Sequence, residues 1–166
     1  MNRIKLEIRN SNIVFATVIA VIFILADFAV WCIAGSPVFA LRFISVRVPV
    51  LPLWIFGLCD FLCFASLGLS IGFALGNKCP SIETEKYRGA FYFSVGVALA
   101  VIHHFIFFMA VSLFAALPVI ILSCAFLLGA IINFYKVSFL PAALSSVAFL
   151  WLFYLFWLNL LAFFLM

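Results

Sequence analysis

The chain has 166 residues, of which 70% are hydrophobic, 19% aromatic and 8% charged, with a formal net charge of +4. A soluble domain is typically about half apolar and a quarter charged, so this chain has too few polar side chains to cover a globule. Together with the mean hydropathy of +1.43, the composition excludes a soluble globular protein and predicts an integral membrane protein.

Five long apolar runs follow one another along the chain, at residues 13–33, 50–75, 90–110, 116–135 and 139–164. Each is about as long as the ~20 residues that a helix needs to cross the hydrocarbon core of a bilayer. Strands of a membrane barrel would instead be about ten residues of alternating polarity. The sequence therefore predicts an all-α fold with one domain over residues 1–166, an integral membrane bundle of five transmembrane helices.

Basic residues lie between the runs rather than in one patch. Seven are predicted on one side of the membrane, namely Arg3, Lys5, Arg9, Lys78, Lys86, Arg88 and Lys136, and two on the other, Arg42 and Arg47. By the positive-inside rule this favours a cytoplasmic N-terminus. We interpret the positive charge as a topology signal and expect no nucleic-acid partner. The many phenylalanines and the lack of a presequence favour a bacterial inner membrane.

A small-residue stripe runs along the second predicted helix as Gly68, Gly72 and Gly76. Small residues four apart let two helix backbones approach closely in a membrane. We expect these glycines to pack against another helix of the same chain, with a second copy of the chain as the alternative.

Ionisable residues inside the apolar runs are functional candidates because a buried charge is costly in lipid. They are Asp27, Asp60, His103 and His104. One interpretation is a carboxylate–imidazole pair that holds the helices together; the other is a proton relay or a polar floor for a ligand pocket. Adjacent histidines lie about 100° apart on a helix, so one helix does not aim both at one ion, and we expect no metal site. No catalytic motif is present, which predicts that the protein is not an enzyme. The five cysteines form no CxxC pair, and we expect no disulfide framework.

Aromatic residues and glycines share one predicted face of the second helix. This face holds Trp54, Gly57, Phe61, Phe64 and Gly68, with Asp60 at its edge. A face of rings and small residues with one acid suits a flat apolar ligand, because ligand pockets are mostly hydrophobic with a few placed polar groups.

At this face the sequence resembles the translocator protein family, also called TspO or tryptophan-rich sensory proteins. The matching residues are Pro52, Trp54, Phe56, Gly57 and Gly68, then Phe107-Phe108, Ala142-Ala143-Leu144, Trp151 and Leu158-Asn159. The chain departs from the family pattern where Asp60 and His103 replace two pocket tryptophans, where Phe64 replaces a tyrosine, and where Val147-Ala148 replace Pro-Tyr.

The resemblance implies a five-helix bundle, often a homodimer, that binds a porphyrin or another flat tetrapyrrole-like molecule in a sensory, regulatory or carrier role. It implies no resident cofactor, although a porphyrin or haem is the expected kind of ligand. The implied ligand-binding residues are Trp54, Asp60, Phe64, His103, Phe107, Phe108, Trp151 and Asn159. In this interpretation Asp60 and His103 face a shared cavity and pair. The alternative function is a small membrane transporter, or a transporter or assembly subunit, that uses the intramembrane Asp and His residues.

Overall fold

Five long helices make up the computed structural model, which describes residues 12–34, 41, 44–45, 50–77 and 83–165. The helices are α2 (Ile13–Ala34), α4 (Leu53–Gly76), α5 (Glu83–His104), α6 (Leu113–Val137) and α7 (Phe139–Leu165), and α5 continues directly into a π-helix, η2 (Phe105–Met109). All five spans are long and apolar enough to cross a membrane. The predicted all-α five-helix bundle is therefore confirmed.

Two helices begin earlier than the sequence predicted. α5 starts at Glu83 rather than at residue 90, because its first turns are polar and were not counted as part of an apolar run. α6 starts at Leu113 rather than at residue 116, with Pro118 inside the helix. Pro118 is the sixth residue of α6, beyond the first turn, so the helix lacks the backbone hydrogen bond that an N–H there would donate. The residues at which the helices begin are thus less predictable than the existence of the spans.

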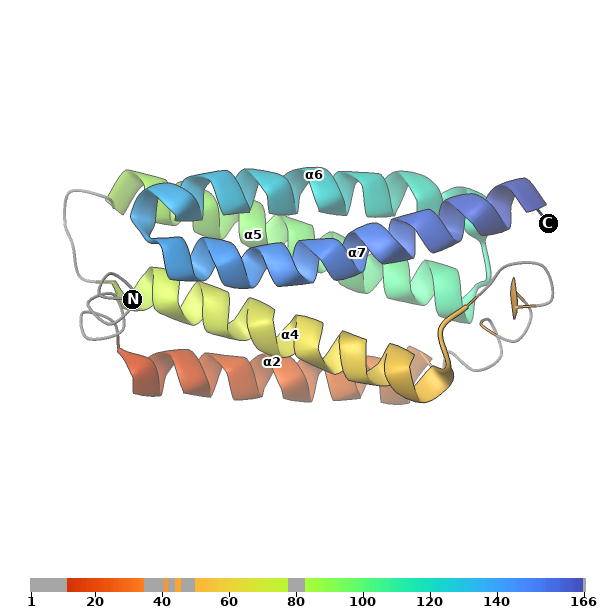
Figure 1. The fold of residues 1–166 in the computed structure, drawn as a ribbon, viewed down its shortest axis with the longest axis horizontal. Helices are drawn as coiled ribbons and strands as arrows, with labels where there is room; N and C mark the ends of the chain where they lie inside the picture. The colour runs from red at the N-terminus through yellow and green to blue at the C-terminus, as the bar shows by residue number, and fades with distance from the viewer. Residues whose placement is uncertain (1–11, 35–40, 42–43, 46–49, 78–82, 166) are drawn as a thin grey trace.

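The order of neighbours around the bundle differs from the order in the chain. α2 packs on α4, α4 on α7, α7 on α6, and α6 on α5. Figure 1 shows α2 at the edge of the bundle beside α4, with α6 at the opposite edge. Contacts of α5 with α2 and α4 are sparser. In this order α4, α7 and α6 each have a neighbour on both sides, and α2 and α5 are at its two ends.

The glycine stripe on α4 lies against α2 of the same chain. A Cβ atom added to Gly72 would lie 2.5 Å from the Ala16 Cα atom, and one added to Gly68 would lie 2.5 Å from the Ala20 Cα atom. At Gly76 the nearest atom, the backbone nitrogen of Asn12, would be 3.3 Å away. Two of the three glycines therefore permit a backbone contact that no larger residue allows, and the third lies where the helices begin to separate.

Serine hydroxyl groups tie other helix pairs together inside the bundle. Ser70 of α4 donates to the Pro141 carbonyl oxygen of α7 at 2.7 Å and shares a 2.6 Å hydrogen bond with Ser145. Ser123 of α6 donates to the Gly96 carbonyl oxygen of α5 at 2.8 Å. These bonds satisfy polar atoms that would otherwise be costly in an apolar interior.

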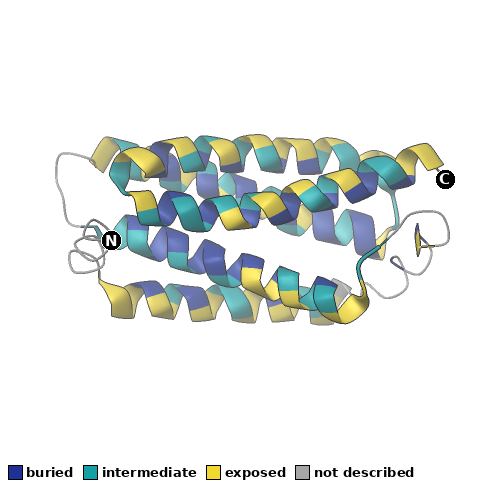
Figure 2. Cartoon of the chain, viewed as in Figure 1, coloured by how far each residue is buried: buried dark blue, intermediate teal, exposed yellow. Residues whose placement is uncertain are grey.

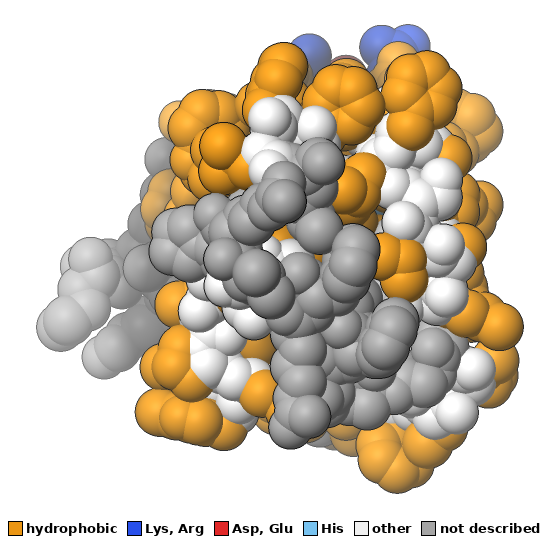
Figure 3. Space-filling view, turned by 90° about the vertical axis from the view of Figure 1, so that its right-hand side faces the viewer, with side chains coloured by type: hydrophobic (Ala, Val, Ile, Leu, Met, Phe, Trp, Pro, Cys, Tyr) orange, Lys and Arg blue, Asp and Glu red, His pale blue; other side chains and the backbone are white. Residues whose placement is uncertain are grey.

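Hydrophobic side chains cover the outside of the bundle as well as its core. Buried residues line the faces where helices meet, whereas the outer faces of α2 and α6 are exposed (Figure 2). The end-on view shows apolar side chains around the bundle (Figure 3). Large exposed examples are Phe28, Phe114 and Phe164. A surface of this kind is stable in lipid and not in water, so the protein is an integral membrane protein. Among the residues used for orientation, Arg3, Lys5, Arg9, Arg42, Arg47 and Lys78 lie outside the described part of the chain.

Candidate functional site

A single carboxylate, Asp60 of α4, is the point where four helices meet. Its side chain is fully buried, with 0% exposure. The Trp31 indole N–H of α2 donates to Asp60 Oδ2 at 2.8 Å, and the Trp151 indole N–H of α7 donates to Oδ1 at 2.8 Å. Nε2 of His104 in α5 lies 3.2 Å from Oδ2. We call these four residues the Asp60 cluster.

The chemistry of the cluster follows from its donors. An indole N–H only donates a hydrogen bond, and an ionised carboxylate only accepts. The two tryptophans are therefore complementary to the Asp60 oxygens. A carboxylate that accepts several hydrogen bonds is stabilised in its charged form, which offsets the cost of removing it from water. The sequence offers an Asp in a span, and the fold supplies three donors from three other helices.

The histidine that pairs with Asp60 is His104, and the expected pairing with His103 is wrong. Adjacent residues on a helix point about 100° apart, so only one of the two faces α4. His103 instead stacks on Phe107, with ring centroids 5.3 Å apart and an angle of 18° between the rings. It is fully buried, and neither of its ring nitrogens has a hydrogen-bond partner among the described residues.

Asp27 of α2 is the second carboxyl group of this region. It is 6% exposed, and its Oδ1 atom has no hydrogen-bond partner in the described part of the chain. It interacts electrostatically with Asp60 and His104. The four ionisable groups predicted from the sequence are therefore all buried in one region.

Phenylalanine rings pack against the Trp151 and His104 side chains of the Asp60 cluster. Phe56 packs edge-on against Trp151, with centroids 4.9 Å apart, and against Phe108 at 5.7 Å. Phe64 meets the His104 ring edge-on at 6.4 Å. Of the rings predicted to bind a ligand, Phe64, Phe107 and Phe108 thus pack against other core residues.

The expectation that Trp54 lines an interior pocket is wrong. Its side chain is 72% exposed, and Phe61 on the same predicted face is also exposed. Apolar side chains occur on every face of α4, so the sequence contains no polar face that marks the outside. Asn159 of α7 is fully buried beside the start of α6, where its amide nitrogen suits donation to the Leu113 carbonyl oxygen at 3.3 Å. It holds two helices together rather than lining a pocket.

A groove between α4 and α7 reaches the Asp60 cluster. Its volume is about 380 Å³, and Leu51, Cys59, Leu62, Cys63, Val147, Leu150, Trp151 and Tyr154 line it. Trp151 and Tyr154 stack with their centroids 5.1 Å apart, and the Tyr154 hydroxyl accepts a hydrogen bond from the Leu51 N–H at 3.4 Å. We call this the α4–α7 groove. Trp151 is the one predicted ligand-binding residue that lines it.

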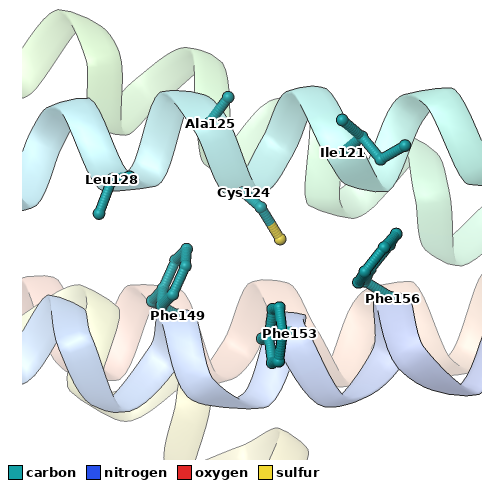
Figure 4. A pocket seen from close by; sticks show the side chains of 7 residues that line it. All are labelled: Ile121, Cys124, Ala125, Leu128, Phe149, Phe153 and Phe156. Carbon is teal, nitrogen blue, oxygen red and sulfur yellow. The ribbon is translucent and has the colours of Figure 1, made fainter.

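A second groove lies between α6 and α7 and contains no ionised or hydrogen-bonding side chain. Its volume is about 200 Å³. Figure 4 shows Cys124 and Ile121 of α6 facing Phe149, Phe153 and Phe156 of α7. Such a surface is suited to contact with lipid chains. It has no link to the Asp60 cluster among the interactions of the described residues.

The described residues contain no group of three or more His, Cys, Asp or Glu side chains placed to hold a metal ion. Cys32, Cys59, Cys63 and Cys124 are free thiols, and Cys79 lies outside the described residues.

Three residues of the site did not follow from the sequence: Trp31, His104 as the partner of Asp60, and Tyr154. One signal for Trp31 was available. A carboxylate buried inside the membrane needs hydrogen-bond donors. Among the largely apolar side chains of the spans, tryptophan supplies one through its indole N–H. Four tryptophans were therefore the first candidates, although their helical faces were not known.

The fold and this site define an α-helical integral membrane protein with five spanning helices and a buried carboxylate at their junction. No model of a known protein family and no curated protein matches the sequence. The assignment of function therefore depends on the geometry of the site.

Proposed function

We propose that this protein binds a small apolar ligand, taken up from the membrane, in the α4–α7 groove. The observation that carries the proposal is the double role of Trp151. This side chain lines the groove and also donates to Asp60 at 2.8 Å. A ligand in the groove therefore contacts a group that is bonded to the junction of four helices.

The size and lining of the groove support this function. Pockets for small molecules have volumes of roughly 300–1,000 Å³ and are lined mostly by apolar side chains with a few polar groups. The groove has a volume of about 380 Å³ and a lining that is apolar except for the Tyr154 hydroxyl and two thiols. The stacked rings of Trp151 and Tyr154 favour a flat molecule, because rings stack on rings.

The resemblance to the translocator protein family suggests the same class of ligand, a flat apolar molecule such as a porphyrin. We propose a sensory or carrier role, in which the bound ligand displaces or tightens Trp151 and so alters the contacts of Asp60. The role assigned to the site is binding, with no reaction at the ligand. The proposed setting is a bacterial inner membrane with the N-terminus in the cytoplasm, and a homodimer as the assembly.

A groove-filling variant tests the proposal without touching the Asp60 cluster. Val147 lines the groove with an exposed side chain, so Val147→Trp fills it from the outside. Ile132→Trp is the matched control, because Ile132 of α6 is similarly exposed and lines neither groove. Purified protein in detergent is titrated with protoporphyrin IX, and tryptophan quenching and the porphyrin absorption band are recorded.

We expect saturable binding in the wild type and in Ile132→Trp, and at least about tenfold weaker binding in Val147→Trp, equivalent to ~1.4 kcal/mol. Replacing Trp151 by Phe should remove most of the quenching, whereas Trp157→Phe, which alters an exposed residue of the same helix, should not. Equal affinities in the two tryptophan-insertion variants would refute the groove as the binding site.

A further inference from the structure

The second groove, which we call the α6–α7 groove, lies on a face of α6 that stays exposed towards the end of the helix. Its lining on α6 consists of Ile121, Cys124, Ala125 and Leu128. This spacing of three and four residues places them on one face of the helix. The same spacing continues through Ile132 to Tyr135, and both of these side chains are exposed. An open track therefore leads from the groove to the last turn of α6.

Two exposed basic side chains, Arg88 and Lys136, are at the end of the bundle that this track reaches. Lys136 follows Tyr135 in the last turn of α6. Arg88 is in the second turn of α5, and the adjoining Gly89 packs against Phe134 of α6. Figure 3 shows Lys and Arg side chains at the top edge of the molecule, where Figure 1 places α6. Neither basic side chain forms an ion pair or a hydrogen bond within the described residues.

The other charged side chains described at this end have local interactions of their own. Lys86 Nζ donates to the Asn77 carbonyl oxygen at 3.1 Å. Glu83 and Glu85 are in the first turn of α5, where a carboxylate interacts favourably with the positive end of the helix dipole. The two exposed basic side chains are thus the cations at this end that are free to bind an anion.

We propose that the α6–α7 groove and these two basic side chains form one binding site for an anionic phospholipid. Lys136 and Arg88 hold the phosphate-bearing headgroup, and one acyl chain follows the exposed face of α6 into the groove. Charge complementarity selects the headgroup, because a zwitterionic lipid has no net charge to match two cations. This second binding activity depends neither on the α4–α7 groove nor on the Asp60 cluster.

Distances along α6 suit an acyl chain. Leu128 precedes Lys136 by eight residues and Ile121 precedes it by fifteen, which correspond to about 12 Å and about 22 Å along the helix axis. One leaflet provides about 15 Å, half of the hydrocarbon thickness. A chain whose headgroup is at Lys136 therefore enters the groove beside Leu128 and ends within it. There the stacked rings of Phe149 and Phe153, with centroids 6.3 Å apart, form an apolar wall on α7 (Figure 4).

Native mass spectrometry of the full chain tests the proposal, because it resolves the protein with and without one bound lipid. The protein is purified in dodecyl maltoside and titrated with dioleoylphosphatidylglycerol or dioleoylphosphatidylcholine, which have the same acyl chains and differ in headgroup charge. A basic residue near the membrane surface strengthens binding of an anionic lipid about fivefold. We therefore expect the first phosphatidylglycerol to bind at least about fivefold more tightly than the first phosphatidylcholine.

One variant of each part of the site has a matched control. Lys136→Gln should weaken phosphatidylglycerol binding about fivefold, whereas Lys86→Gln removes the same charge from a side chain that already has a carbonyl partner and should not. Leu128→Trp fills the groove and should weaken binding by a similar factor. Leu122→Trp should not, because Leu122 is an exposed residue of α6 that lines neither groove.

Three results would overturn the proposal. Equal affinities for the two lipids would remove the charge match, and equal losses in Lys136→Gln and Lys86→Gln would show attraction by net charge alone. A loss in Lys136→Gln without one in Leu128→Trp would show a phosphate contact without the acyl chain. If Leu128→Trp does not fold, Ala125→Phe, at another exposed lining position, replaces it. No porphyrin is present, so failure of ligand binding in the α4–α7 groove leaves this result unaffected.

Discussion

Replacing Asp60 by Ala should destabilise the bundle more than truncation of any other polar side chain among the residues that the structure describes. The substitution removes the acceptor of two 2.8 Å indole hydrogen bonds and of the 3.2 Å contact with His104. Each hydrogen bond to a charged group contributes about 1.5–3 kcal/mol, and breaking a buried ion pair on one side costs about 3–5 kcal/mol. Loss of the buried charge offsets part of the sum, so we expect a net destabilisation of about 3–5 kcal/mol.

The assay is reversible unfolding in mixed micelles with a rising fraction of sodium dodecyl sulfate, followed by tryptophan fluorescence. Asp60→Asn keeps one acceptor oxygen but turns an amide N–H toward a donor, so its loss should be smaller than that of the alanine variant. Glu83→Ala, which alters an exposed acid in the first turn of α5, is the control. If Asp60→Ala unfolds at the same detergent fraction as Glu83→Ala, the hydrogen bonds to Asp60 do not stabilise the fold and the argument fails.

Three further variants test separate contacts in the same unfolding assay. Gly72→Leu should destabilise the protein by several kcal/mol, because its side chain would occupy the space of the Ala16 backbone; near wild-type stability would show that α2 does not pack there. Trp31→Phe should cost about 1–3 kcal/mol through the lost hydrogen bond to Asp60, and an unchanged midpoint would contradict that bond. His103→Phe should be neutral or stabilising, because it replaces a buried imidazole that has no hydrogen-bond partner in the described part of the chain by an apolar ring of similar shape; a clear loss of stability would reveal a partner for His103.

Helix number and type were predictable because the bilayer imposes a length. Each span must satisfy its own backbone groups over about 30 Å of hydrocarbon, and the apolar runs record that requirement directly. The helix ends were not predictable to the same degree. Outside the hydrocarbon the length constraint no longer applies, so the polar turns from Glu83 to Arg88 join α5 without any apolar signal. Pro118 likewise does not mark the start of α6.

The composition of the site was partly predictable, but its pairing was not. Asp60 and Trp151 were both named from the sequence, and both are at the junction of the helices. The choice between His103 and His104 depends on the rotation of α5 about its axis, and a span that is apolar on all sides contains little information about that rotation. The prediction that Trp54 lines an interior pocket failed for the same reason. In a soluble protein a polar face would have marked the outside of the helix.

The packing of α2 makes the Asp60 cluster more than a local hydrogen-bond network. α2 is at the edge of the bundle, and its contact with the rest of the protein is mainly with α4. Near the N-terminal end of α2, the contact consists of Ala16 and Ala20 packed against the glycine stripe of α4, without polar side chains. Towards the other end of the helix it is the bond from Trp31 to Asp60 and the interaction between the Asp27 and Asp60 carboxyl groups.

Both polar attachments of α2 to the cluster therefore end on one side chain. Loss of Asp60 as an acceptor removes the bond from Trp31, whereas the glycine contact does not involve this side chain. Since apolar packing between helices gains little from lipid exclusion, these polar bonds account for a large share of what orients α2. The orientation of α2 in the bundle therefore depends on the Asp60 side chain.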